Sequence, residues 1–230
     1  MYEAVRPFPC GQSTAARCAV RADSLGFDGI VVLASPEQAD RSRCARIAAS
    51  VDVDVVAGTK LAERDNGSLA RAIQTVRPAV DLVCVEAGSP DLRRFVSTRD
   101  RVDVLLDPIG EDGPIAHTVV KQAATHGVMI ALDLQPLLTA RGAERSGYAR
   151  HLRELARILA HYDAPTVLTG RPASHLAMRA PRELIALGTA VGIDASLLTR
   201  GLGTWAPRVE RNREIRDDSF IGPGVRRNDR

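Results

Sequence analysis

Short apolar segments alternate with longer amphipathic segments through nearly the whole chain, and this alternation constrains the fold more than any other feature. The apolar segments are rich in Val, Ile and Leu, and most of them are apolar on both faces, which is typical of parallel strands covered by helices. We therefore predict seven strands, at residues 2–5, 29–33, 53–57, 82–86, 102–106, 128–132 and 166–168.

The segments between these strands carry helix signals. Pro181 suits a first helical position, and Gly26, Gly127 and Gly192 suit the left-handed residue that ends a helix. The predicted helices span 13–25, 36–50, 68–76, 91–97, 114–126, 149–161, 181–191, 195–202 and 206–215. Regular alternation of strands and helices predicts an α/β fold with right-handed crossovers.

The length and composition of the chain fit one domain. A chain of 230 residues with 45% hydrophobic residues can bury a core, and aromatic residues make up only 3%, so the core is expected to be aliphatic. We predict a single (β/α) barrel-like domain over residues 1–220, with an open doubly wound sheet as the alternative. The polar, Gly-rich residues 221–230 are expected to form a flexible tail.

Neither a membrane segment nor a metal-binding cysteine motif is predicted. No apolar run approaches the roughly 18 residues that a membrane span needs, and residues 1–11 lack the apolar stretch of a signal peptide. We therefore expect a cytoplasmic protein. Cys10, Cys18, Cys44 and Cys84 form no CxxC pair, so we expect buried free thiols and no zinc site.

Four charged residues lie where the predicted strands end at their carboxyl side, namely Lys60, Glu86, Asp107 and Asp133. In a barrel this end carries the active site, so the set is compatible with a metal-dependent phosphoesterase or with a metabolic enzyme that uses Lys60 as a base. The five histidines, however, fall in predicted helices or loops and have no HxH or HExxH spacing. The alternative is structural: Asp107 and Asp133 cap turns or form ion pairs, and Glu86 pairs with Lys60.

An arginine-bearing segment between residues 169 and 192 carries a second candidate site. Arg171, His175 and Arg179 are spaced by four, so a helix would place them on one face. Arg182 lies in the first turn of the next predicted helix, where a positive side chain opposes the helix dipole unless Glu183 or an anion compensates. A phosphate at that helix start would satisfy both the free amides and the arginines.

The same segment resembles a known family. The block from Ser174 to Leu184, SHLAMRAPREL, is similar to a signature of the archaeal ribonuclease P protein component 3 family, which is also the family of the eukaryotic thirty-kilodalton subunit. Weaker similarities lie in the same order along the chain, among them the GFDG motif that begins at Gly26 and the YDAP motif that begins at Tyr162. The resemblance covers nearly the whole sequence.

The resemblance implies a barrel-like fold related to the polymerase-and-histidinol-phosphatase hydrolases but without their metal ligands. The first strand agrees, because it reads YEAVRP where an HxH would be expected. It also implies a subunit without catalysis of its own that binds ribonuclease P RNA, pairs with ribonuclease P protein component 2 and assists removal of the 5′ leader from precursor tRNA. The chemistry would be carried by magnesium on the RNA, with no cofactor bound by the protein.

On this interpretation we predict that Arg171, Arg179 and Arg182 contact RNA phosphates, with Lys121 and Lys60 as weaker candidates. Lys60 and Lys121 are the only lysines, and every other basic side chain apart from histidine is arginine. Arginine suits phosphate contacts because its planar fork stays charged. No catalytic or metal-binding residue is predicted.

Overall fold

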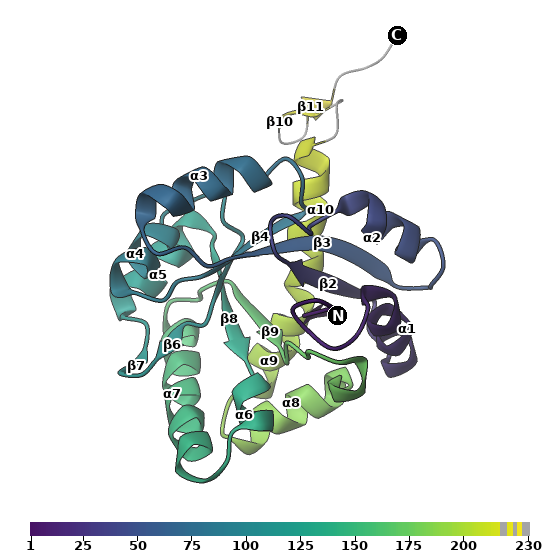
Figure 1. The fold of residues 1–230 in the computed structure, drawn as a ribbon. Coiled ribbons are helices and arrows are strands. Elements are labelled where there is room, and N and C mark those ends of the chain that lie inside the picture. The colour runs from purple at the N-terminus through teal and green to yellow at the C-terminus, as the bar shows by residue number, and fades with distance from the viewer. Residues whose placement is uncertain (217–219, 223–224, 227–230) are drawn as a thin grey trace.

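A seven-stranded parallel sheet that curls into a nearly closed barrel forms the centre of the protein (Figure 1). The computed structural model describes residues 1–216, 220–222 and 225–226. Strand order follows the chain, and every neighbouring pair is parallel. The strands are β1 (Tyr2–Val5), β2 (Gly29–Ala34), β3 (Asp54–Leu61), β4 (Leu82–Glu86), β5 (Val104–Leu106), β8 (Met129–Asp133) and β9 (Thr166–Thr169). All seven predicted strands and the barrel-like fold are confirmed.

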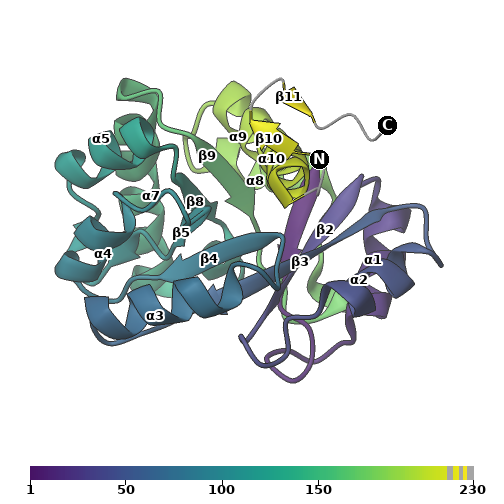
Figure 2. The ribbon, with the colours of Figure 1, turned by 90° about the horizontal axis from the view of Figure 1, so that it is seen from above.

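Helices cover the outside of the sheet (Figures 1 and 2). They are α1 (Ala15–Leu25), α2 (Arg41–Ala48), α3 (Asn66–Val76), α4 (Pro90–Val96), α5 (His117–His126), α7 (Gly142–His161), α8 (Pro181–Ala190) and α9 (Ala195–Gly203). A short helix α6 (Gln135–Thr139) follows β8, and α10 (Trp205–Arg216) ends the barrel. Gly26 and Gly127 end α1 and α5 with φ of 81° and 68°, in the left-handed conformation that the sequence predicted.

Some element boundaries differ from the prediction for local reasons. Helix α2 begins at Arg41 and not at residue 36, because the carboxylate of Asp40 accepts hydrogen bonds from the amides of Ser42 and Arg43 and fixes the helix start. Helix α7 begins at Gly142, well before residue 149. The sequence analysis also missed a hairpin of β6 (Ile109–Gly110) and β7 (Gly113–Pro114), whose strands are only two residues long.

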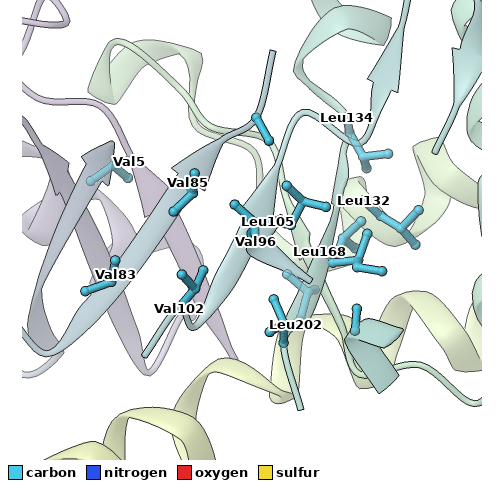
Figure 3. Packing of buried hydrophobic residues seen from close by; sticks show 14 of the residues in the cluster. Val5, Val83, Val85, Val96, Val102, Leu105, Leu132, Leu134, Leu168 and Leu202 are labelled. Carbon is cyan, nitrogen blue, oxygen red and sulfur yellow. The ribbon is translucent and has the colours of Figure 1, made fainter. Parts of the chain in front are cut away.

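Two apolar layers arise from the alternation of side chains along the strands. One set fills the barrel interior and consists of Tyr2, Ala4, Val31, Leu33, Val56, Leu82, Cys84, Val104, Leu106, Met129, Ala131 and Val167. The other set faces the helices and includes Val5, Val83, Val85, Leu105, Leu132 and Leu168 (Figure 3). Because both faces are buried, the strands are apolar throughout, which explains the pattern seen in the sequence.

Helix α10 closes the end of the barrel where the strands begin. The buried indole of Trp205 packs with the interior set, and its Nε1 donates to the carbonyl of Leu168 at 3.1 Å. The Asn212 amide donates to the carbonyl of Asp81 at 2.9 Å and to the carboxylate of Asp103 at 2.8 Å, both just before a strand. Arg213 pairs with the carboxylate of Asp54 through two hydrogen bonds, of 2.9 and 3.0 Å. This end of the barrel is therefore sealed by the chain itself.

The seam between β9 and β1 is joined mainly by a side chain. Glu3 is 1% exposed, and its carboxylate accepts hydrogen bonds from the Thr169 hydroxyl and, at 3.1 Å, from the amide of Gly170. Just past the strands, the Arg6 amide donates to the carbonyl of Pro172 at 3.0 Å. Burial raises the pKa of Glu3 to about 7, although the bonds from Thr169 and Gly170 oppose the shift.

Three of the four predicted buried thiols are buried, at Cys18, Cys44 and Cys84, but Cys10 is exposed in the loop after β1, so that part of the prediction is wrong.

The predicted tail lies partly outside the described residues; within them, β10 (Phe220–Gly222) pairs antiparallel with β11 (Val225–Arg226). Among the described helices, none is long and apolar enough to cross a membrane.

We predict that Glu3→Gln removes a pH dependence of stability. The folded-state pKa of Glu3, about 7, lies above its ordinary value of 4.5, so between these two pH values the folded state binds more protons than the unfolded state. The free energy of unfolding of the natural protein should therefore fall as pH rises through this window, by up to about 3 kcal/mol from this group. Urea unfolding of both proteins from pH 4.5 to 7.5 measures the difference.

The matched control is Glu154→Gln, which removes an exposed carboxylate on α7 and is expected to leave the pH profile unchanged. A constant difference in unfolding free energy between Glu3→Gln and the natural protein across the window would contradict the prediction.

Candidate functional site

The mouth of the barrel, where the strands end, is occupied by the side chain of Arg171. Its Nε lies 2.6 Å from Oδ2 of Asp133, its Nη1 lies 3.2 Å from Oε1 of Glu86, and its Nη2 lies 2.5 Å from Oδ1 of Asp107. Arg171 is 9% exposed and follows β9, whereas the three carboxylates follow or end β5, β8 and β4. One guanidinium thus ties together four elements around the mouth.

The electrostatics of this cluster favour the ion pairs. Burial alone disfavours the charged guanidinium, but Asp133, Asp107 and Glu86 outweigh burial and raise the pKa of Arg171. Burial also raises the pKa of Asp133, against the effects of Arg171 and of the Gln135 amide, which donates to Asp133 Oδ1 at 2.8 Å. The cluster therefore favours the charged guanidinium of Arg171, whereas burial works against the charge on Asp133.

Backbone strain accompanies the same cluster. Asp107 and Arg171 have φ values of 49° and 38°, in the left-handed region that side chains other than glycine rarely adopt. Each such residue costs on the order of 1 kcal/mol, and the ion pair between the two side chains offsets part of that cost. Strain of this kind persists only where surrounding contacts determine the conformation.

The four charged residues predicted at the strand ends do converge at the mouth, but in structural roles. Lys60, which lies within β3 and not after it, pairs with Glu86 at 2.9 Å, as the sequence suggested. Asp133 caps the following turn and, like Asp107, pairs with Arg171. Within the described residues no group of three His, Cys, Asp or Glu side chains is placed to hold a metal ion.

The segment after β9 does not form the helical face that the spacing of Arg171, His175 and Arg179 suggested. Residues 170–174 are not helical, and a single 3₁₀ turn, η1 (His175–Ala177), precedes α8. Pro172 explains this, because a proline disfavours helical backbone at the residue before it, here Arg171. Arg171 points into the mouth, whereas Arg179 is exposed, so the helical-face prediction is wrong.

Arg179 and Arg182 lie at the start of α8 and are both exposed. Glu183 folds back so that its Oε2 accepts from the amide of Ala180 at 2.8 Å, which occupies this carboxylate at the helix start. In the part of the chain that the structure describes, neither arginine forms an ion pair with a carboxylate. Two guanidinium groups at a helix start, where the dipole is positive, favour an anion as their partner.

Helix α1 extends this surface. A hollow of about 540 Å³ lies between Ser24 at the end of α1 and Arg182 at the start of α8. A second hollow, of about 410 Å³, lies between α1 and η1, where Arg17, Arg21 and His175 line it. The sequence analysis did not find Arg17 and Arg21, because their proximity to η1 arises only when the two ends of the barrel meet.

The two lysines of the predicted site lie elsewhere. Lys60 is partly buried and paired at the mouth, and Lys121 is exposed on α5. The structure thus brings together Arg179 and Arg182 but neither lysine with them. Whether any of these residues contacts RNA stays a prediction.

Comparison with known proteins places the chain in a family. A profile of the RNase P subunit p30 family matches residues 5–218. The chain belongs to this family. A protein of Halobacterium salinarum named Ribonuclease P protein component 3 is 42% identical over 228 residues, which cover 99% of this chain and 97% of that protein. The protein of the same name from Haloarcula marismortui is 38% identical, and these residues cover 100% of this chain and 97% of that protein.

A more distant relative with the same name, from Methanococcoides burtonii, is 27% identical, over 94% of this chain and 89% of that protein. Among solved structures, a chain in the cryo-EM structure of archaeal ribonuclease P with mature tRNA matches with a TM-score of 0.81 at 18% identity, over 95% of each chain. At that identity the match supports the fold. The suspected family of the sequence analysis is confirmed.

We predict that Arg171→Met destabilises this p30-family protein by about 3–5 kcal/mol, because it leaves three carboxylates around a buried site without their cation. Arg171→Lys should recover only part of this loss, since a lysine cannot form the fork that bridges the three groups. Urea unfolding at neutral pH measures both. Arg179→Met is the surface control and should change stability by about 0.5 kcal/mol or less. An unfolding free energy for Arg171→Met within 1 kcal/mol of the natural value, about the size of a surface effect, would contradict the assignment.

Proposed function

We propose that this protein is a non-catalytic subunit of ribonuclease P that binds the catalytic RNA and supports endonucleolytic removal of the 5′ leader from precursor tRNA. Its membership of the p30 family and its similarity to proteins named Ribonuclease P protein component 3 support the proposal. The particle would be cytoplasmic.

The observation that carries the proposal is the occupation of the barrel mouth by Arg171. An enzyme of this architecture uses the carboxyl ends of its strands for chemistry. Here Glu86, Asp107 and Asp133 are all partners of a guanidinium from the same chain. Acid–base or nucleophilic use of these groups would require the ion pairs to break, which argues against a phosphoesterase or a metabolic barrel enzyme.

RNA contact is assigned instead to the start of α8. Arg179 and Arg182 are exposed there, and in the described residues no carboxylate pairs with them, so both can reach phosphate oxygens. Such contacts give affinity without reading the base sequence. Arg171 is removed from the RNA-binding set because its nitrogens are committed to carboxylates. Lys60, which is tied to Glu86, ranks below Lys121 as a further contact.

The partners follow from the family. The protein would act together with ribonuclease P RNA, precursor tRNA and other ribonuclease P proteins, including ribonuclease P protein component 2. Magnesium ions on the RNA would supply the chemistry, and this chain would bind no cofactor. Its own role is to hold phosphates at a fixed position on a rigid scaffold, which is how non-reacting contacts help a reacting site.

We predict that replacing Arg179 and Arg182 together with Ala lowers cleavage of precursor tRNA by the reconstituted particle at limiting magnesium, by about tenfold, while the unfolding transition is unchanged. The loss of two phosphate contacts should also reduce the salt dependence of RNA binding, by about 1–2 in the slope of log K against log salt. Cleavage assays and filter binding across a salt series measure the two effects.

The matched control is Arg43→Ala with Arg46→Ala, which removes the same charge from the exposed side of α2. An equal loss in the control would assign the effect to net charge, and an unchanged cleavage rate in the Arg179 and Arg182 variant would contradict the site.

A further inference from the structure

A groove between α3 and α4 lies apart from both the barrel mouth and the start of α8. Its volume is about 370 Å³. The side chains that define it come from α3, from α4 and from the loop that follows α4, and they are Arg71, Gln74, Phe95, Arg99, Asp100 and Arg101. In Figure 1, α3 and α4 lie on the opposite side of the barrel from α8. Nothing in the proposed function uses this groove.

The groove is strongly cationic. Arg71, Arg99 and Arg101 are exposed, and none of them forms an ion pair with a carboxylate in the described part of the chain. Asp100 is the one acidic residue that lines it, and its Oδ1 lies 3.2 Å from Nδ1 of His126 on the neighbouring helix α5. Three guanidinium groups against one carboxylate around one hollow favour an anionic ligand.

A stacked pair lies in the same groove. The guanidinium carbon of Arg99 sits 4.0 Å from the centroid of the Phe95 ring, which is a cation–π contact. The ring holds the guanidinium in place, so its planar group can act as a platform for a nucleobase, in the way that arginine planes and aromatic rings stack unpaired bases. Gln74, which is exposed beside this pair, offers both a donor and an acceptor to the edge of a base.

None of the exposed large hydrophobic side chains in the described residues lies in the groove. Binding surfaces for proteins centre on large apolar or aromatic anchors. The exposed large hydrophobic residues among those described are Phe8, Val20, Leu138, Leu176 and Ile215, and none of them lines this groove. Cationic side chains around a stacking platform suit a single-stranded nucleic acid.

We propose that the α3–α4 groove binds an unpaired RNA segment, with one base stacked on Arg99 over Phe95 and the flanking phosphates held by Arg71 and Arg101. This inference rests on the proposed function only in taking RNA as the ligand; it adds a second contact site and a different mode of contact. The start of α8 holds phosphates alone, whereas the groove also holds a base.

The experiment measures binding of fluorescein-labelled eight-nucleotide oligoadenylate, oligouridylate and an RNA duplex of the same length to the full chain, across a salt series. The natural protein should bind single strands more tightly than the duplex and oligoadenylate more tightly than oligouridylate, because adenine stacks better. Arg99→Lys keeps the charge but loses the planar group, so it should lose about tenfold in oligoadenylate affinity with an unchanged salt slope. Arg71→Gln and Arg101→Gln should each weaken both oligonucleotides alike and lower the salt slope by about 0.7.

Arg46→Gln, an exposed arginine on α2, is the matched control and should bind as the natural protein does. The proposal is overturned if Arg99→Lys binds both oligonucleotides with natural affinity, if the duplex binds as tightly as the single strands, or if the groove variants lose only the binding of another protein subunit. Failure of this proposal can be distinguished from failure of the proposed function. If cleavage of precursor tRNA depends on Arg179 and Arg182 but Arg99→Lys changes neither cleavage nor binding, the groove proposal is wrong and the proposed function stands. If the oligonucleotides bind through Arg99 but the protein does not support cleavage of precursor tRNA, the groove proposal would stand and the proposed function would fail.

Discussion

One buried guanidinium determines what the rest of this molecule can do. Arg171 bridges carboxylates from three other elements at the place where a barrel enzyme would keep its reactive groups. Buried charges are costly unless they are paired, so each member of the cluster depends on the others. The same interaction joins the loop after β9 to β4, β5 and β8, and thereby fixes the closing part of the barrel. The stability of the mouth and the pairing of its carboxylates follow from one set of contacts.

The other openings of the barrel are closed in the same self-contained way. Helix α10 covers the starting ends of the strands, with Trp205 inside the barrel and Arg213 paired with Asp54 at the rim. Glu3 bridges the gap between β1 and β9, the two end strands of the seven-stranded sheet, which do not pair with each other. The mouth of the barrel and the starting ends of its strands are thus filled by the protein's own side chains. The proposed contact surfaces lie outside the barrel, at α8 and α1 and in the α3–α4 groove.

The strands and most helix ends could be predicted because their causes are local: apolar runs, capping side chains and glycines in left-handed turns. The role of Arg171 could not, because its partners Glu86, Asp107 and Asp133 are far away in sequence and meet only in the closed barrel. Pro172 was the one local signal against a helical face through Arg171. Arg17, beside η1, was missed for the same reason, since α1 and the segment after β9 are at opposite ends of the chain.

The positions of the free arginines have a geometric consequence for an RNA-bound particle. Helices α3 and α4, which line the groove, lie on the opposite side of the barrel from α8 (Figure 1). If both bind RNA, the protein spans two separate RNA segments and sets the distance between them. Arginine suits both surfaces, because the same planar group would fork onto a phosphate at Arg182 and would support a base at Arg99. The barrel would then act as a spacer, and its internal ion pairs would matter to the RNA because they keep that spacing constant.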